Sequence, residues 1–228
     1  ADLCSSYRPI SLLNVEVKII AKVLADRLRE KISTVIHPDQ AGFMPGRATY
    51  HNIRRVHNAL ALGGQLEGPL ALVTLDMEKA FDSVSWRYLF ALLKRMNFGP
   101  NFIRLVKILY AGPSAAVRIG GEMSEQFPIS RGTRQGCPLS PLFFALAIEP
   151  LAGLFRTDGR LRGFEWGESL SDKVALYADD VLLFLSSLDQ SGPRVAHILR
   201  QFALLSGLQV NYGKSAIYVL GDTPYRAE

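Results

Sequence analysis

Two adjacent aspartates interrupt one apolar segment, and they limit how that segment can fold. Residues 174–185 read Val-Ala-Leu-Tyr-Ala-Asp-Asp-Val-Leu-Leu-Phe-Leu. Burying an unpaired carboxylate is costly, so we expect Asp179 and Asp180 at the tip of a hairpin between two strands within 173–185. A bound cation would account for this pair. An ordinary solvent-exposed turn, where aspartate is common, accounts for it equally well.

A second apolar segment also ends on a carboxylate. Residues 70–76 read Leu-Ala-Leu-Val-Thr-Leu-Asp, which predicts a buried strand followed by Asp76. Such an aspartate often caps a helix. Together with the hairpin pair, however, it supplies the carboxylates that a two-Mg²⁺ site for phosphoryl transfer requires. The sequence leaves open whether the three aspartates meet in space.

The remaining elements predict an α+β fold. Ile20, Leu24, Leu28 and Ile32 recur every four residues and predict a helix over 15–36, which Pro38 ends. A hairpin is expected around Gly120-Gly121, and a last strand near 215–220. Further helices are expected near 49–62 (ended by Gly63-Gly64), 85–96, 100–110, 139–155 and 191–205. Because strands and helices do not alternate regularly, α+β is favoured over a doubly wound parallel sheet.

Composition permits a globular core and excludes several classes of protein. The 228 residues are 48% apolar, enough for one domain or two closely joined subdomains. The two cysteines and four histidines show no ligand spacing, which favours reduced thiols and an intracellular protein. No apolar run predicts a membrane span and no signal peptide is apparent. The net charge of +5 suits a nucleic-acid partner without requiring one.

One apparent motif is rejected. Residues 207–215 resemble a P-loop, but five residues separate Gly207 from Gly213 where the motif has four. The segment is also expected between a helix and a strand, whereas a P-loop follows a strand and opens a helix.

Six segments of the chain, at residues 6–14, 40–47, 76–86, 131–142, 177–180 and 207–214, follow one another in an order typical of one family. In this order and over nearly its whole length, the chain resembles the LINE-type (non-LTR) reverse transcriptases. The segments correspond to that family's opening segment, its fingers motif and its motifs A, B, C and D. A lone Tyr-x-Asp-Asp at 177–180 would be weak evidence, but all six segments in the family's order are specific.

This resemblance implies a right-hand polymerase made of a palm, with an antiparallel sheet packed on helices, and fingers. It implies fingers at 1–69 and a palm at 70–228, with a further fingers insertion at roughly 87–139. The thumb is expected to be missing, because the chain stops before the helical segment that forms it. The termini look like cuts through a longer polyprotein, whose missing thumb and endonuclease domains would be partners.

The resemblance also implies site residues. Asp76, Asp179 and Asp180 would hold two Mg²⁺ ions, for which Mn²⁺ can substitute, and Asp180 is the least certain direct ligand. The backbone of Met77, Glu78, Lys79 and Ala80 would cradle the incoming triphosphate. Lys214 would protonate the leaving pyrophosphate, although a surface lysine is an equal alternative.

Three further residue assignments concern the nucleotide and its phosphates. Phe81, five residues after Asp76, is at the position of the steric gate that selects deoxynucleotides. Gln135 and Gly136 would line the nucleotide pocket, with Gly136 permitting close backbone approach. Arg47 would meet the β- and γ-phosphates. The alternatives are a core aromatic, a plain turn and a solvated loop arginine. Candidate template contacts are Arg54, Arg55, Arg131 and Arg134.

The implied function is RNA-directed DNA polymerisation for retrotransposition, using deoxynucleotides, an RNA template and a DNA primer, in the nucleus and cytoplasm. A catalytically silent nucleic-acid-binding relic of a retroelement is the alternative. An RNA polymerase or a cyclase with a similar palm is a third reading, against which Phe81 argues.

Overall fold

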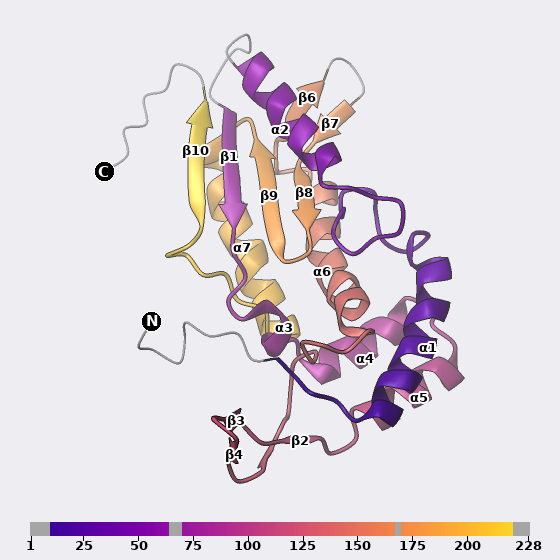
Figure 1. Cartoon of the computed structure of the whole chain (residues 1–228). Helices are drawn as coiled ribbons and strands as arrows, with labels where there is room; N and C mark the ends of the chain where they lie inside the picture. The colour runs from indigo at the N-terminus through magenta and orange to yellow at the C-terminus, as the bar shows by residue number, and fades with distance from the viewer. Residues whose placement is uncertain (1–9, 64–69, 167–169, 221–228) are drawn as a thin grey trace.

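A four-stranded antiparallel sheet forms the centre of the computed structural model, which describes residues 10–63, 70–166 and 170–220. The strand order is β10-β1-β9-β8 (Figure 1). The strands are β1 (Leu70–Leu75), β8 (Val174–Tyr177), β9 (Asp180–Leu185) and β10 (Ala216–Leu220). The predicted α+β class, with an antiparallel sheet packed on helices, is therefore confirmed.

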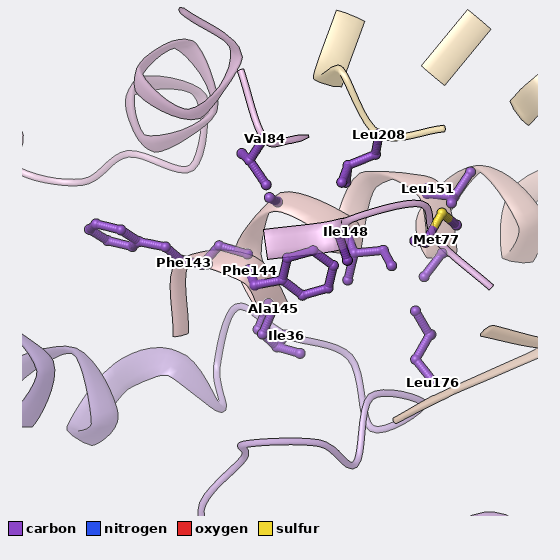
Figure 2. Packing of buried hydrophobic residues seen from close by; sticks show 14 of the residues in the cluster. Ile36, Met77, Val84, Phe143, Phe144, Ala145, Ile148, Leu151, Leu176 and Leu208 are labelled. Atoms are coloured by element: carbon purple, nitrogen blue, oxygen red, sulfur yellow. The ribbon is translucent and has the colours of Figure 1, made fainter. Parts of the chain in front are cut away.

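One face of the sheet packs on a helix that is buried on nearly all sides. Ala71, Val73 and Leu75 of β1 belong to the same buried cluster as most of α6 (Ser140–Thr157). Figure 1 shows α6 and α7 (Leu188–Ser206) behind the sheet. Close by, Figure 2 shows the core side chains Phe144, Ile148, Leu151, Met77, Leu176 and Leu208 gathered around α6. This core anchors β1, β8 and β9 against one helix.

The opposite face is covered at one end by α2 (Tyr50–Gly63) (Figure 1). Leu70, Leu72 and Phe184 form a smaller buried cluster there with Ala59 of α2. Ala175 of β8 and Phe164 of the short strand pair β6 (Phe164–Trp166) and β7 (Leu170–Asp172) complete this cluster. Because side chains alternate along a strand, the same face carries Asp76 just beyond the end of β1.

Helices α1, α4 and α5 pack together beyond the lower end of the sheet in Figure 1. They span Val15–Ile32, Trp86–Arg95 and Pro100–Leu109, and the four-residue α3 spans Ala80–Ser83. The hairpin around Gly120 is built from β2 (Ser114–Ala115), β3 (Arg118–Ile119), β4 (Glu122–Met123) and β5 (Phe127–Pro128). These elements agree with the predicted ranges to within a few residues.

The first helix differs from its prediction in length and in its buried face. It ends at Ile32 rather than at residue 36, and the chain turns through Ser33 toward Pro38. Ile20 is 46% exposed, whereas Ala21 and Ala25 are fully buried. The small alanines allow α1 to lie close against α6. The buried face of α1 therefore includes Ala21 and Ala25 together with the predicted Leu24, Leu28 and Ile32, but not Ile20.

Some predicted features fall outside the described residues. Residues 6–9 of the opening segment, Gly64 and Cys4 are among them. Cys137 is a free, buried thiol. Within the described ranges, no helix combines the length and apolar character needed to cross a membrane.

Arg55 of α2 ties the helix to the sheet through ion pairs. Its guanidinium donates to both carboxylate oxygens of Asp172, at 3.0 and 2.7 Å, and to Asp39 at 3.3 Å. It also donates to the Val174 carbonyl at 2.9 Å and lies over the Phe184 ring. Arg55 was a candidate template contact, but in this structure its guanidinium N–H groups donate to other residues of the protein and stabilise the fold.

The same ion-pair network continues to α6. Arg156 donates to Asp39 at 3.0 Å and to the buried Glu149. Burial raises the pKa of Glu149, and the neighbouring Arg156 opposes that rise. The network thus neutralises carboxylates drawn from a loop, a helix and a strand.

Replacing Arg55 by Gln is expected to destabilise the protein by about 2–4 kcal/mol, because in a partly buried setting Asp172 would lose its bidentate ion pair and Asp39 one of its two arginine partners. Arg54→Gln is the matched control. Arg54 is exposed on the same helix, so its replacement should change the unfolding free energy by less than about 0.5 kcal/mol. Urea denaturation of both variants measures the difference. Equal stabilities would show that the Arg55 ion pairs contribute little.

Candidate active site

Strand pairing brings Asp76 and Asp180 to neighbouring positions on one sheet face. β1 and β9 are antiparallel, and Leu75 pairs with Val181. Continuing that register by one residue sets Asp76 opposite Asp180. Directly opposed residues of antiparallel strands project from the same face. This is the face that α2 covers only at its other end.

These two carboxylates line one cavity of about 300 Å³ with Lys214. Its other lining residues are Asn52, Thr74, Leu75, Ala175, Tyr177, Val181 and Leu182. Thr74 contacts the backbone of Ala216, and Asn52 donates to the Leu176 carbonyl at 2.9 Å. The cavity therefore draws polar groups from α2, β1, β8, β9 and the loop before β10.

Asp179 lies in the turn between β8 and β9 and is half-buried. It does not line the cavity that Asp76 and Asp180 share. Among the residues that the structure describes, no three histidine, cysteine or carboxylate side chains are close enough together to hold a metal ion. The structure thus places Asp76 and Asp180 opposite each other, with Asp179 in the adjoining turn, and metal binding by the three aspartates stays a prediction.

The backbone after Asp76 is partly engaged by the loop before β10. The Glu78 amide donates to the Gln209 carbonyl at 2.8 Å, and Asn211 donates to the Asp76 carbonyl at 2.8 Å. Met77 is buried in the core. In the described part of the chain, no hydrogen bond engages the amides of Lys79 and Ala80. Lys79 has the left-handed backbone conformation (φ 45°) that begins α3. Of the four predicted cradle residues, Glu78 is thus the one whose amide is engaged within the described chain, and contact of any of them with a phosphate stays a prediction.

Phe81 lies between two other aromatic rings. It stacks on Phe144 with ring centroids 4.7 Å apart and meets Phe43 edge-on at 6.2 Å. Its ring is half-exposed, and Phe43 is 47% exposed. Stacking on the buried α6 makes the ring a rigid surface. The Phe81 ring is therefore packed on the core and at the same time partly accessible, and its role as a steric gate stays a prediction.

Gln135 and Gly136 are held by neighbouring chain segments. The Gln135 side chain donates to Asp82 at 3.4 Å, and burial raises the pKa of Asp82 while this hydrogen bond opposes the rise. Gly136 has a φ of 104°, and a Cβ there would lie 2.8 Å from the Ser11 carbonyl oxygen. The close backbone approach expected at Gly136 is thus made in this structure by residue 11. Contact of either residue with a nucleotide stays a prediction.

Arg47 and Arg134 also have protein partners. Arg47 donates to the carbonyls of His37, Gln40 and Ile36 at 2.5, 2.8 and 2.8 Å. Arg134 donates to the Leu109 carbonyl and lies over the Tyr110 ring. Arg54 and Arg131 are exposed. The phosphate role predicted for Arg47 is not tested by this geometry.

Sequence reasoning gave no role to Gln40, although its motif was noted. Gln40 is fully buried and hydrogen-bonds the hairpin turn beside Asp179. Nothing in the residues next to Gln40 in the sequence indicates that its side chain is buried. The adjacent Ala41-Gly42-Phe43, two small residues in a loop, was the available hint that another backbone lies close.

Comparison with known proteins reveals one consistent set of similarities. The family described as "Reverse transcriptase (RNA-dependent DNA polymerase)" matches residues 1–225. The chain is 36% identical over 215 residues to the "Transposon TX1 uncharacterized 149 kDa protein" of Xenopus laevis, covering 94% of this chain and 16% of that protein. It is 32% identical over 178 residues to the "Retrovirus-related Pol polyprotein from type-2 retrotransposable element R2DM" of Drosophila melanogaster, covering 78% and 16%.

Solved structures agree on the fold. Telomerase from Candida tropicalis, in a complex with an RNA fragment, superposes with a TM-score of 0.60 at 15% identity, over 89% of this chain and 33% of that one. An apo telomerase from the same organism, truncated from its C-terminal domain, gives a TM-score of 0.59 over 92% and 41%. The chain spans about a sixth of the two curated relatives' length.

Proposed function

The chain belongs to the reverse transcriptase (RNA-dependent DNA polymerase) family, and from this premise we propose that it is the catalytic core of an RNA-directed DNA polymerase. It adds deoxynucleotides to a primer 3′-hydroxyl on an RNA template, in the service of retrotransposition. The observation that carries the proposal is the cavity shared by Asp76, Asp180 and Lys214, at the end of two paired strands.

Reverse transcriptases generally use divalent metal ions, and we propose Mg²⁺, as two ions, with Mn²⁺ as a substitute. Asp76, Asp179 and Asp180 are the residues that would hold it. Mg²⁺ binds through one or two carboxylates plus substrate phosphates, so a cage of three assembled protein ligands is not needed beforehand. When bound, the ions lower the barrier for attack and stabilise the leaving oxygen. The opposed pair Asp76 and Asp180 supports this fit.

The chain's own residues bind and orient the nucleotide. The amides of Lys79 and Ala80 can donate to phosphate oxygens near the start of α3. The Phe81 edge excludes a 2′-hydroxyl, and Gln135 contacts the sugar or template next to it. Lys214, exposed at the cavity, gives a proton to the leaving pyrophosphate.

The wider setting is also proposed. The RNA template and DNA primer are the partners, together with the thumb and endonuclease domains of a longer polyprotein, in the nucleus and cytoplasm. Residues 1–69 form fingers and 70–228 the palm, with a fingers insertion at roughly 87–139. The origin of all four central strands in 70–228 supports this division.

A catalytically silent nucleic-acid-binding relic remains the second candidate. The observation in its favour is that the described residues hold no cluster of three metal-ligating side chains. Measurements of metal binding and of catalysis in single aspartate variants distinguish the polymerase from the silent relic.

Primer extension on an RNA template with deoxynucleotides and Mg²⁺ is expected for the chain. Asp179→Asn or Asp76→Asn should lower the rate at least about 100-fold, since each removes a charge that would hold the metal. Asp26→Asn, an exposed aspartate on α1, is the matched control and should leave the rate unchanged. If the chain binds Mn²⁺ with unaltered affinity after Asp179→Asn, the proposed metal site is wrong.

Phe81→Ala should reduce the preference for deoxynucleotides over ribonucleotides at least about 10-fold, because the ring edge that meets the 2′-hydroxyl is removed. The measurement is kcat/KM for each nucleotide in the same extension assay. Phe43→Ala tests the neighbouring ring, which contacts Phe81 edge-on and should affect the preference less. An unchanged preference in Phe81→Ala would show that Phe81 is a core residue and not a gate.

A further inference from the structure

A loop far from the aspartates in sequence runs along the open edge of the hairpin that carries them. Residue 40 forms a parallel bridge with Leu176 of β8. The Ala41 amide donates to the Leu176 carbonyl, and the Leu176 amide donates to the Asp39 carbonyl, each at 2.9 Å. The loop therefore pairs with β8 on the side that β9 does not occupy.

The side chain of Gln40 satisfies both backbone polar groups of the turn residue Ala178. Its Nε2 donates to the Ala178 carbonyl at 3.1 Å, and its Oε1 accepts from the Ala178 amide at 3.0 Å. The same Oε1 accepts from the Gly42 amide at 2.8 Å. Gln40 is fully buried, so water cannot replace these hydrogen bonds without rearrangement.

Ala178 needs such support because its backbone is in a costly conformation. Its φ is 57°, in the left-handed region that residues with a Cβ rarely adopt. Ala178 follows the end of β8 and directly precedes Asp179, so its conformation sets how the chain passes through Asp179 to Asp180, the first residue of β9. A relaxed turn would rotate both carboxylates.

Two neighbours hold the loop itself against the turn. A Cβ added to Gly42 would lie 2.1 Å from the Ala178 nitrogen, so the close approach requires glycine. Arg47 donates to the Gln40 carbonyl and to two other carbonyls of residues 36–40. The contacts form a chain from Arg47 through Gln40 to Ala178 and the aspartates.

We propose that Gln40 is a positioning residue for the metal site: it holds the Ala178 turn in its left-handed conformation and thereby aligns Asp179 and Asp180 with Asp76. The proposal rests on the metal-binding role assigned to these aspartates above. It gives the 36–47 loop a part in catalysis that does not depend on direct contact with the nucleotide.

The test compares the Mn²⁺ affinity of variants of the 228-residue chain, measured by electron paramagnetic resonance. Gln40→Met has nearly the same size and removes all three hydrogen bonds, and we expect its affinity to fall at least about 10-fold, since small misplacements of site groups have large effects. Gly42→Ala should lower the affinity through a different contact, by displacing Ala178. Amide hydrogen exchange at Ala178 should accelerate in Gln40→Met.

Matched controls separate positioning from general destabilisation. Ser206→Ala also removes a buried side chain that makes two backbone hydrogen bonds, far along the chain at the end of α7. Gly159→Ala adds a methyl group where nothing lies within 4 Å. Both should retain Mn²⁺ affinity, even if Ser206→Ala lowers the melting temperature as much as Gln40→Met does.

Asp179→Asn is the reference variant. If it weakens Mn²⁺ binding while Gln40→Met and Gly42→Ala bind normally, Gln40 is a structural residue and the positioning proposal is overturned. If Asp179→Asn itself binds Mn²⁺ normally, the metal site assigned under the proposed function is wrong. A loss of affinity in Gln40→Met and Gly42→Ala, but not in the controls, supports the positioning role.

Discussion

The antiparallel pairing of β1 with β9 is the constraint on which the candidate site depends. It joins segments more than a hundred residues apart and sets Asp76 opposite Asp180. The register is strongly specified, because a slip of one residue would turn Ala71, Val73 and Leu75 away from α6 and drive Asp76 into the core. Burial of one face thus fixes the position of the charged groups on the other.

The second constraint acts on the hairpin's free side. β8 is an edge strand of the central sheet, and an unpaired edge beside a strained turn would leave Asp179 poorly defined. The loop at residues 39–42 covers this edge by pairing with Leu176. One side of the hairpin is therefore held by β1 and the other by a segment that lies before the sheet in sequence. The geometry of the turn therefore depends both on β1 and on the loop at residues 39–42.

Local patterns in the sequence predicted the four strands of the central sheet, the hairpin around Gly120 and most of the helices, because each pattern lies in consecutive residues. The strand ends at Asp76 and Asp180 were predicted for the same reason, since a carboxylate marks where an apolar strand leaves the core. The strand pair β6–β7 was not predicted. Long-range choices were not predictable in this way. Arg55 has a structural role rather than the predicted template contact because it pairs with Asp172 and Asp39, which are distant in sequence. The contact of Gly136 with Ser11 likewise depends on how distant segments meet.

The distribution of charge distinguishes Asp76 and Asp180 at the strand ends from the neighbouring carboxylates, and it supports the cation site proposed there. Asp39, Asp172 and Glu149 are paired with Arg55 and Arg156, so their charges are offset within the protein. The cavity between β1 and β9 is lined by two carboxylates, Asp76 and Asp180, and one cation, Lys214, which is exposed. In this lining, carboxylates therefore outnumber basic side chains by two to one. Because a flexible exposed lysine screens a carboxylate pair weakly, the divalent cation proposed above would be the better counter-charge to these carboxylates.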